Sequence, residues 1–149
     1  MNVSTPHSPT TVRTFAQQLS STRRGARLAR LLAVAEFQAW QVPPSVAERA
    51  EQIVAELAAN AALHGRVQGR DFRLALTLDT ATGTLGIAVT DTRGERRPTL
   101  RPDRAPDDEA GRGLLLVHAL ADEWGTDPFP PSGKTVWALL RPATDAPQG

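Results

Sequence analysis

The sequence predicts an α+β domain, a two-layer α/β sandwich in which helices cover one face of a mostly antiparallel sheet. Two segments with apolar residues at helical spacing occupy residues 22–40 and 44–66. Two segments with alternating apolar and polar residues follow at 72–79 and 84–91, and a short turn joins them, so they should pair antiparallel. Because these strands form a hairpin and do not alternate strictly with helices, a doubly wound parallel sheet is not expected.

The first elements are expected to begin near Thr11. Residues 1–10 hold two prolines among mostly small polar residues, which predicts a flexible tail. Residues 12–19 carry β-branched and aromatic side chains, which favours a first strand. Thr22 is expected to cap a helix that ends near Trp40, with one apolar stripe toward the core and its arginines mostly elsewhere. The predicted stripe consists of Leu28, Leu31, Leu32, Ala35 and Ala39.

The segment 44–66 carries the most informative helix. Ser45 is expected to be its N-cap, because Glu48 completes a capping box, and Gly65 is expected to end it. The predicted buried face consists of Val46, Ala50, Ile53, Leu57 and Ala61. A second series, Glu56, Asn60 and His64, falls on a strip that overlaps the edge of that face. These three side chains are therefore candidates for a half-buried site.

The rest of the chain is predicted to complete the domain over residues 11–142. Residues 92–110 hold three prolines, many charges and almost no apolar side chains, which predicts a lid or binding loop, with a disordered insertion as the alternative. A helix is expected from Leu114 to Asp122. Two closing strands, EWGTDPF and KTVWALLR, flank a turn at Pro130–Gly133, and residues 143–149 are expected to be a second tail.

Composition narrows the functional classes. Seventeen Lys and Arg residues against sixteen Asp and Glu residues give a net charge of +1, and the few aromatic residues are scattered, so direct nucleic-acid binding is not expected. The absence of cysteine excludes disulfides, thiolate metal sites and cysteine nucleophiles. The sequence shows neither an apolar signal-peptide core nor an apolar run of about 18 residues. A cytoplasmic location without membrane attachment is therefore the expectation.

Several polar residues could carry chemistry. A carboxylate and an amide one helical turn apart suit a magnesium–phosphate group, with the Asn60 amide oxygen as a metal ligand and Glu56 as a general base. Asp91, at a strand end, could accept a hydrogen bond from an exocyclic amino group such as that of adenine. Gly111–Gly113 could let backbone N–H groups approach phosphates at a helix N-terminus, with the intervening arginine adding charge. Each feature taken alone is more often structural.

Together and in this order, these blocks resemble the GHKL ATPase superfamily, and bacterial anti-sigma-factor serine/threonine kinases most closely. The resemblance spans about Thr11 to Arg141. It rests on ELAANAALHG at 56–65, VTDTRG at 89–94, GRGLLLVHALADEWG at 111–125 and GKTVWALL at 133–140. It implies a Bergerat-type ATP-binding fold, ATP with Mg²⁺, Glu56 as the catalytic base and Asn60 as the metal ligand. The implied nucleotide-binding residues are Asn60, Asp91, Gly94, Gly111, Arg112, Gly113, Leu114 and Thr135.

The resemblance also implies partners. Asp91 would bond the adenine amino group, Thr135 would support that pocket, and the phosphate acceptor would be a serine of an antagonist protein. A sigma factor held inactive would be the second partner, and a homodimer is left open.

One block departs from the family. Its adenine-site block usually reads D-x-G-x-G, whereas Asp91 is followed by Thr92, Arg93, Gly94 and Glu95, which leaves both glycine positions unfilled. Bulkier residues there would narrow the pocket or restrict the turn. The alternative function is therefore a non-catalytic protein-binding module with weak or no nucleotide binding. A third reading is an α/β domain whose polar strip is structural.

Overall fold

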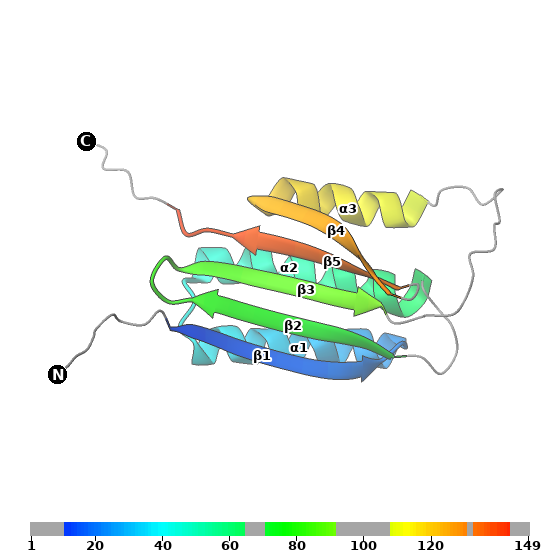
Figure 1. The fold of residues 1–149 in the computed structure, drawn as a ribbon, viewed down its shortest axis with the longest axis horizontal. Coiled ribbons are helices and arrows are strands. Elements are labelled where there is room, and N and C mark those ends of the chain that lie inside the picture. The colour runs from blue at the N-terminus through cyan, green and yellow to red at the C-terminus, as the bar shows by residue number, and fades with distance from the viewer. Residues whose placement is uncertain (1–10, 65–70, 92–107, 131–132, 144–149) are drawn as a thin grey trace.

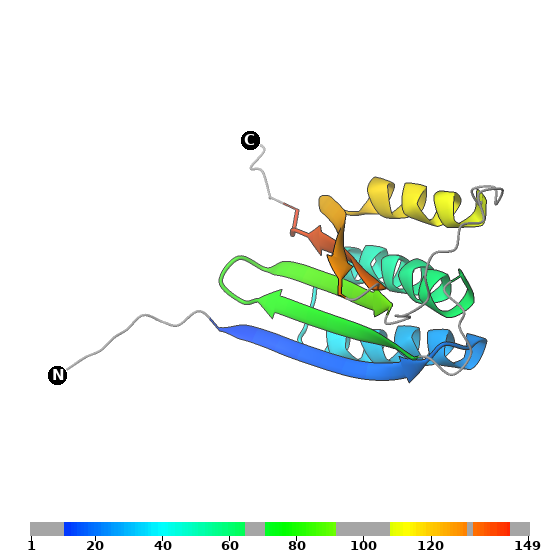
Figure 2. The ribbon, with the colours of Figure 1, turned by 45° about the vertical axis from the view of Figure 1, so that its right-hand side comes forward.

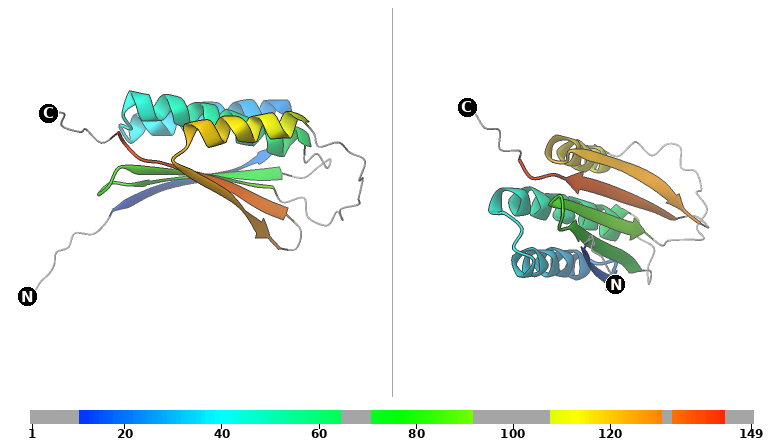
Figure 3. Two further views of the ribbon diagram at one scale, coloured as in Figure 1. Left: turned by 90° about the horizontal axis from the view of Figure 1, so that it is seen from above. Right: turned by 60° about the vertical axis from the view of Figure 1, so that its left-hand side comes forward.

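The computed structural model describes residues 11–64, 71–91, 108–130 and 133–143. In chain order, the elements are β1 (Val12–Ser20), α1 (Arg23–Ala39), α2 (Pro44–Ala59), the π-helical turn η1 (Asn60–His64), β2 (Asp71–Asp79), β3 (Thr84–Asp91), α3 (Asp108–Leu120), β4 (Glu123–Phe129) and β5 (Gly133–Leu140). The strands form one antiparallel sheet in the order β1-β2-β3-β5-β4. The three helices cover one face of this sheet (Figures 1 and 3). The predicted two-layer α+β sandwich is confirmed.

The core lies between the sheet and the helices. In β2, the residues Phe72, Leu74, Leu76 and Leu78 are buried, and their cross-strand partners in β3 include Val89, Ile87 and Leu85, which are also buried. On α2 and the turn η1 that continues it the predicted face is confirmed, because Val46, Ala50, Ile53, Leu57 and Ala61 are all buried. Each fully buried large aliphatic or aromatic side chain stabilises the fold by about 1.5–3 kcal/mol. No helix within the described ranges is both long and apolar enough to span a bilayer.

The start of α2 differs from the prediction. Pro43 is the N-cap residue and makes no side-chain capping bond, while Pro44 is the first helical residue and Ser45 lies inside the helix. The prediction of Ser45 as the cap was therefore wrong. Proline suits the first helical position because its φ is already helical and its missing N–H would have no partner there. At the other end the helix continues into η1, and Gly65 lies outside the described residues.

The buried stripe of α1 also differs from the prediction. Thr22 is the N-cap as expected, and its Oγ1 accepts a hydrogen bond from the Gly25 N–H at 2.9 Å. The buried residues, however, are Gly25, Ala29, Ala33 and Phe37. Of the predicted stripe, Leu28 and Leu31 are exposed, as are Ala35 and Ala39, and only Leu32 packs against the core.

Close approach of backbones explains this difference. A Cβ atom at residue 25 would lie 1.9 Å from the Ser20 carbonyl oxygen, so only glycine fits where α1 begins beside the end of β1. The glycine therefore fixes which side of the helix faces the sheet. Small alanines continue on that side, and the larger leucines are left on another.

The helix α3 begins at Asp108 and ends at Leu120, whereas the sequence predicted Leu114 to Asp122. The predicted lid 92–110 therefore overlaps the first residues of α3, and its remaining residues, 92–107, lie outside the described ranges. The Arg49 side chain on α2 donates a hydrogen bond to the Leu120 carbonyl oxygen at 3.0 Å. A cation is favourable there because the last carbonyl groups of a helix carry partial negative charge. This contact fixes the end of α3 against α2.

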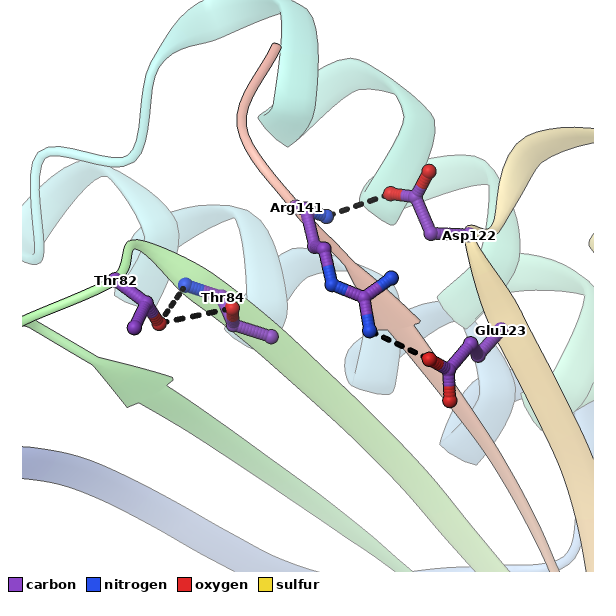
Figure 4. A network of polar contacts seen from close by, with 5 residues as sticks. All are labelled: Thr82, Thr84, Asp122, Glu123 and Arg141. Atoms are coloured by element: carbon purple, nitrogen blue, oxygen red, sulfur yellow. Dashed lines mark hydrogen bonds and ion pairs between the residues drawn. The ribbon is translucent and has the colours of Figure 1, made fainter. Parts of the chain in front are cut away.

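The closing hairpin of β4 and β5 forms as predicted. Just beyond β5, the Arg141 N–H donates to Asp122 Oδ2 at 2.6 Å, and the Arg141 guanidinium pairs with Glu123 (Figure 4). The hydrogen bond and the charge of Glu123 raise the pKa of Arg141 above its ordinary value. These contacts tie the end of β5 to the start of β4.

The turn between β2 and β3 is built from short polar side chains. The Asp79 carboxylate accepts a hydrogen bond from the Ala81 N–H at 2.8 Å, and Thr82 Oγ1 accepts from the Thr84 N–H at 3.2 Å (Figure 4). Gly83 has φ of 79°, in the left-handed region that glycine adopts at least cost. This turn joins two fully paired strands and confirms the predicted hairpin.

Candidate functional site

The predicted site residues are carried by elements that meet at one end of the molecule. The C-terminal end of α2 with η1, the end of β3, the beginning of β5 and the beginning of α3 all lie toward the same side (Figures 1 and 2). The turn η1 contacts α3, β2 and β3. The fold therefore gathers segments that are far apart in the sequence around the end of α2.

Glu56 and Asn60 lie one helical turn apart at that end of α2. The Asn60 backbone N–H donates to the carbonyl groups of Glu56 and Leu57, so the helical spacing between Glu56 and Asn60 is preserved. Both side chains are half-buried, as predicted, while Leu57 is fully buried beside them. Residues four apart on a helix are neighbours on its surface. The carboxylate and the amide therefore belong to one local surface at the edge of the core.

Asn60 also begins the π-helical turn η1, which the sequence did not predict. Single π turns within helices occur frequently at functional sites. His64 is the last residue of η1, and its side chain is outside the described part of the structure. Of the predicted series, the structure therefore describes the side chains of Glu56 and Asn60 and not that of His64.

Asp91 is the last residue of β3 and faces the helical layer. Its cross-strand partners are Phe72, which is fully buried, and Lys134, which is exposed. Side chains alternate along a strand, so Asp91 shares the face of the buried residue Val89. The half-buried Asp91 carboxylate is thereby directed to the same side of the sheet as Glu56 and Asn60.

Thr135 is placed differently from the expectation. Its Oγ1 is 2.7 Å from Oγ1 of its cross-strand partner Thr90, and the two hydroxyls form a hydrogen bond. Thr90 and Asp91 are consecutive residues of one strand, so their side chains point to opposite faces. The structure does not bring Thr135 to the face of Asp91. By register, Lys134 and not Thr135 occupies the position beside Asp91 on the helix-covered face.

The other predicted nucleotide-binding residues lie on or before α3. Gly111, Arg112, Gly113 and Leu114 are inside the helix and not before it, because α3 begins at Asp108. The N–H groups without helical partners belong to the first turn of a helix, whereas Gly113 lies in the second turn. Leu114 packs against the core. Gly94 lies outside the described residues.

Two further residues of this region, Gly133 and Lys134, were not predicted as site residues from the sequence. Lys134 is the only lysine of the chain, and its pairing with Asp91 became visible only with the register of β3 and β5. Gly133 packs directly on the backbone of Asp91. A glycine at the start of the last strand was the available signal for close backbone approach.

The oxygen donors at this end suit a hard cation held together with phosphates. Within the described ranges, no three His, Cys, Asp or Glu side chains gather as a metal-binding cluster.

A hollow of about 250 Å³ lies elsewhere, between the end of α1 and the start of α2. It is lined by Val34, Phe37, Gln38, Val42, Pro44, Ala47, Glu48 and Glu51. It lies at the opposite end of α2 from Glu56 and Asn60.

Comparison with known proteins agrees with this architecture. The sequence model of the family described as the histidine kinase-like ATPase domain matches residues 19–139 of this chain. A solved chain comprising the RsbU and RsbW domains of Rv1364c from Mycobacterium tuberculosis is similar with a TM-score of 0.66 and 20% identity, over 87% of this chain and 32% of that chain. A chain of the SiaB–SiaC complex from Pseudomonas aeruginosa is similar with a TM-score of 0.61 and 14% identity, over 85% of this chain and 88% of that one.

These two likenesses are evidence of a shared fold. The present chain spans about a third of the length of the Mycobacterium chain. A search of curated proteins found no significant match.

Proposed function

This chain belongs to the histidine kinase-like ATPase domain family, and we propose that it binds ATP with Mg²⁺ and phosphorylates a serine or threonine of an antagonist protein, as an anti-sigma-factor kinase. In this proposal the unphosphorylated antagonist and a sigma factor compete for the protein, so phosphorylation of the antagonist controls transcription by partner switching.

The observation that carries the proposal is the common placement of three polar residues. Glu56 and Asn60 lie half-buried at the end of α2, and Asp91 lies half-buried at the end of β3 on the helix-covered face. The contact of η1 with β3 joins these two segments. Carboxylate and amide groups on a half-buried surface between a helix and a sheet are suited to hold a polar ligand in a fixed orientation.

The residues fit Mg²⁺ and ATP by their donor chemistry. The Asn60 amide oxygen is a hard donor of the kind that Mg²⁺ accepts alongside phosphate oxygens and water. The Asp91 carboxylate accepts hydrogen bonds and suits the exocyclic amino group of adenine. The exposed Lys134 beside it contributes positive charge. When bound, Mg²⁺ would neutralise charge on the phosphates.

Glu56 is proposed to act as the general base that accepts the proton of the acceptor hydroxyl. In the proposed transfer, the acceptor hydroxyl oxygen forms a bond to the γ-phosphorus while the bond from that phosphorus to the β–γ bridging oxygen breaks, and ADP leaves. The hydroxyl proton passes to the Glu56 carboxylate. A positioned general base typically contributes 10²–10⁴-fold to a rate. Positioning of the reactants supplies much of the remainder in phosphoryl transfer.

The proposed partners are supported at the level of the fold. One of the similar solved structures is a complex of two proteins, SiaB and SiaC, so a protein of this fold is found together with a second protein. The Mycobacterium chain combines RsbU and RsbW domains. A regulatory function through protein contacts is therefore the role proposed for this chain.

A second candidate function is a non-catalytic binding module on the same fold. The residues after Asp91 favour it, because Arg93 and Glu95 stand at the two positions where the family pattern has glycine, and Gly94 lies between them. Side chains at these positions would reduce the room for a nucleotide. In that case the protein would hold its partner with weak or no dependence on ATP.

Two measurements separate these functions. Calorimetry with Mg-ATP is expected to detect binding to the wild type and a loss of affinity in Asp91→Asn, and no detectable binding would contradict the ATP-binding proposal. Transfer of labelled γ-phosphate to a cognate antagonist is expected for the wild type. Binding of Mg-ATP without any transfer to an antagonist that forms a complex with the protein would favour the binding module.

A further inference from the structure

One polar pair interrupts an otherwise apolar row of the sheet. The row crosses all five strands on the helix-covered face, and the strand register sets which residues are neighbours in it. In sheet order the row consists of Leu19, Phe72, Asp91, Lys134 and Pro128. Only the aspartate and the lysine have side chains that form hydrogen bonds. A ligand edge that meets this row can therefore bond only to these two side chains.

The pair lies where the core meets solvent. Asp91 is half-buried at the end of β3, and Lys134 is exposed at the start of β5. Directly opposite residues of antiparallel strands have Cβ atoms about 4.5–5.5 Å apart. The end of β3 contacts η1, and the start of β5 lies beside that end (Figure 1). The carboxylate and the ammonium group can therefore face one ligand together.

The next row on the same face is apolar at these two strands. Val89 pairs with Val136, and the first is buried in the core while the second packs against it. Within β3 and β5, Lys134 is the only cationic residue. An apolar surface with a few polar groups at its edge suits a purine, because the ring is flat and its polar atoms lie at its rim.

The two side chains have opposite hydrogen-bonding character. An ionised Asp91 only accepts hydrogen bonds, and the Lys134 ammonium group only donates them. Adenine presents a donating 6-amino group beside the accepting N1, so the amino group matches the aspartate and N1 matches the lysine. Guanine presents the reverse order, an accepting O6 beside a donating N1–H and 2-amino group. With O6 at the lysine and both donors at the aspartate, guanine satisfies the pair as well.

We propose that Lys134 extends the nucleotide range of this site from ATP to GTP, because it supplies the donor that guanine O6 requires. The inference rests on the proposed function, in which Asp91 binds the base. A carboxylate alone would face O6 with a second acceptor and would repel it. Lysine suits both purines, since its flexible stem lets a compact charge move between neighbouring positions. Lys134 is thus a specificity-determining residue.

A contact of Lys134 with the phosphates is the alternative, because an exposed ammonium group also suits an anion. The position in the row argues against it. The neighbour of the lysine is the Asp91 carboxylate, which would repel a phosphate placed beside it. The two contacts also differ in their consequences. A phosphate contact strengthens ATP and GTP equally, whereas a base contact changes the ratio of their affinities.

Competition binding of ATP and GTP to the full chain, each with Mg²⁺, tests the proposal. The wild type is expected to bind GTP within about tenfold of ATP. Lys134→Met keeps the length of the side chain and removes its charge and its donors. GTP affinity should then fall about 10–100-fold, as the loss of a hydrogen bond to a charged group does. ATP affinity should fall about threefold or less, because Asp91 still holds the amino group and N1 can bond water.

Arg73→Met is the matched control. Arg73 lies at the same end of the sheet and is exposed, but it neighbours the buried Phe72 along β2 and so points to the opposite face. The variant removes one positive charge and should leave both affinities unchanged. Inosine triphosphate has O6 and N1–H but no 2-amino group, so Lys134→Met should weaken its binding by the same factor as that of GTP. Circular dichroism should confirm that both variants are folded.

A direct observation of the contact is available because Lys134 is the only lysine of the chain. Protein labelled with ¹³C-lysine gives one lysine side-chain signal in NMR spectra. Mg-GTP should shift this signal. Magnesium tripolyphosphate, which has no base, should leave it in place.

Three outcomes would overturn the proposal and leave ATP binding intact. These are GTP that fails to compete with bound ATP, a GTP-to-ATP affinity ratio that is the same in Lys134→Met and the wild type, and an equal shift of the lysine signal with tripolyphosphate. Absence of ATP binding to the wild type would instead contradict the proposed function, and the proposal with it.

Discussion

Gly133 lies so close to Asp91 that a Cβ atom at residue 133 would be 2.1 Å from the Asp91 carbonyl oxygen. The contact joins the first residue of β5 to the last residue of β3. Both contacting groups belong to backbones, so neither can move aside as a flexible side chain would. Gly133 therefore allows β5 to approach the segment that presents Asp91 to the helix-covered face.

The first prediction concerns this contact. Gly133→Ala should displace Asp91, weaken Mg-ATP binding at least tenfold, and lower the free energy of unfolding by about 1–3 kcal/mol, as overpacking does. Gly125→Ala is the control, because its Cβ would meet the Trp137 ring at 2.7 Å, and a side chain can shift. Calorimetry and thermal unfolding measure the two effects. Equal ATP affinity of the Gly133 variant and the wild type would show that the contact does not position the site.

The second prediction concerns the proposed metal ligand. Asn60→Ala should abolish the magnesium-dependent part of ATP binding, because it removes the amide oxygen while the capping bond of Asn60 uses the backbone N–H. Titrations with Mg-ATP and with ATP in EDTA separate the two contributions. Gln52→Ala, at an exposed position of α2, should bind as the wild type does. An unchanged magnesium dependence in Asn60→Ala would exclude this ligand.

The third prediction separates chemistry from binding. Glu56→Gln preserves the size of the side chain but removes its ability to take a proton, so Mg-ATP affinity should stay within about threefold while phosphoryl transfer falls about 10²–10⁴-fold. Glu48→Gln, which changes an exposed carboxylate on the same helix, is the control. Single-turnover transfer to the antagonist measures the chemical step. Full transfer activity in Glu56→Gln would remove Glu56 as the base.

The β2–β3 hairpin was predictable because the alternation of apolar and polar residues along a strand indicates which side chains face the core. The pattern of β2 and β3 indicated both the strands and their inner faces, and the structure buries Phe72, Leu74, Leu76 and Leu78 as expected. The same reasoning succeeded for α2, where the predicted residues Val46, Ala50, Ile53 and Leu57 are buried. In such elements the burial of large apolar side chains outweighs every other local preference.

Prediction failed where contact distance and not hydrophobicity decides the packing. α1 turns Ala29 and Ala33 inward and leaves Leu31 outside, because Gly25 must lie against the Ser20 carbonyl group. Likewise serine is a residue type that often caps helices, but Ser45 is not the cap here, because Pro44 already occupies the first helical position, which suits proline. The spacing of apolar residues indicates which face of a helix is apolar. It does not indicate which face can lie close to the backbone of a neighbouring element.

The position of Thr135 depends on register, which the sequence leaves open. A shift of one residue between β3 and β5 would exchange the faces of Lys134 and Thr135. The observed pairing places Lys134, and not Thr135, beside Asp91. Only the tertiary structure contains this information.

The fourth prediction tests that register through the hydroxyl pair of Thr90 and Thr135. Thr90 is 9% exposed, so loss of its partner should leave a buried polar group unsatisfied. Thr90→Val and Thr135→Val should each lower the free energy of unfolding by about 1–3 kcal/mol. The double variant should cost less than the sum of the two, because both polar groups are then absent and valine suits a strand. Denaturant unfolding of the four proteins measures the coupling.

Mg-ATP binding to Thr135→Val completes this test. Thr135 lies on the opposite face of the sheet from Asp91, so the variant should bind Mg-ATP within about twofold of the wild type once both are fully folded. Lys134→Thr changes the residue that shares the face of Asp91 and should alter the affinity more. A large loss of ATP affinity in Thr135→Val, together with an unchanged free energy of unfolding, would contradict the register. It would return Thr135 to the pocket role that the family resemblance implies.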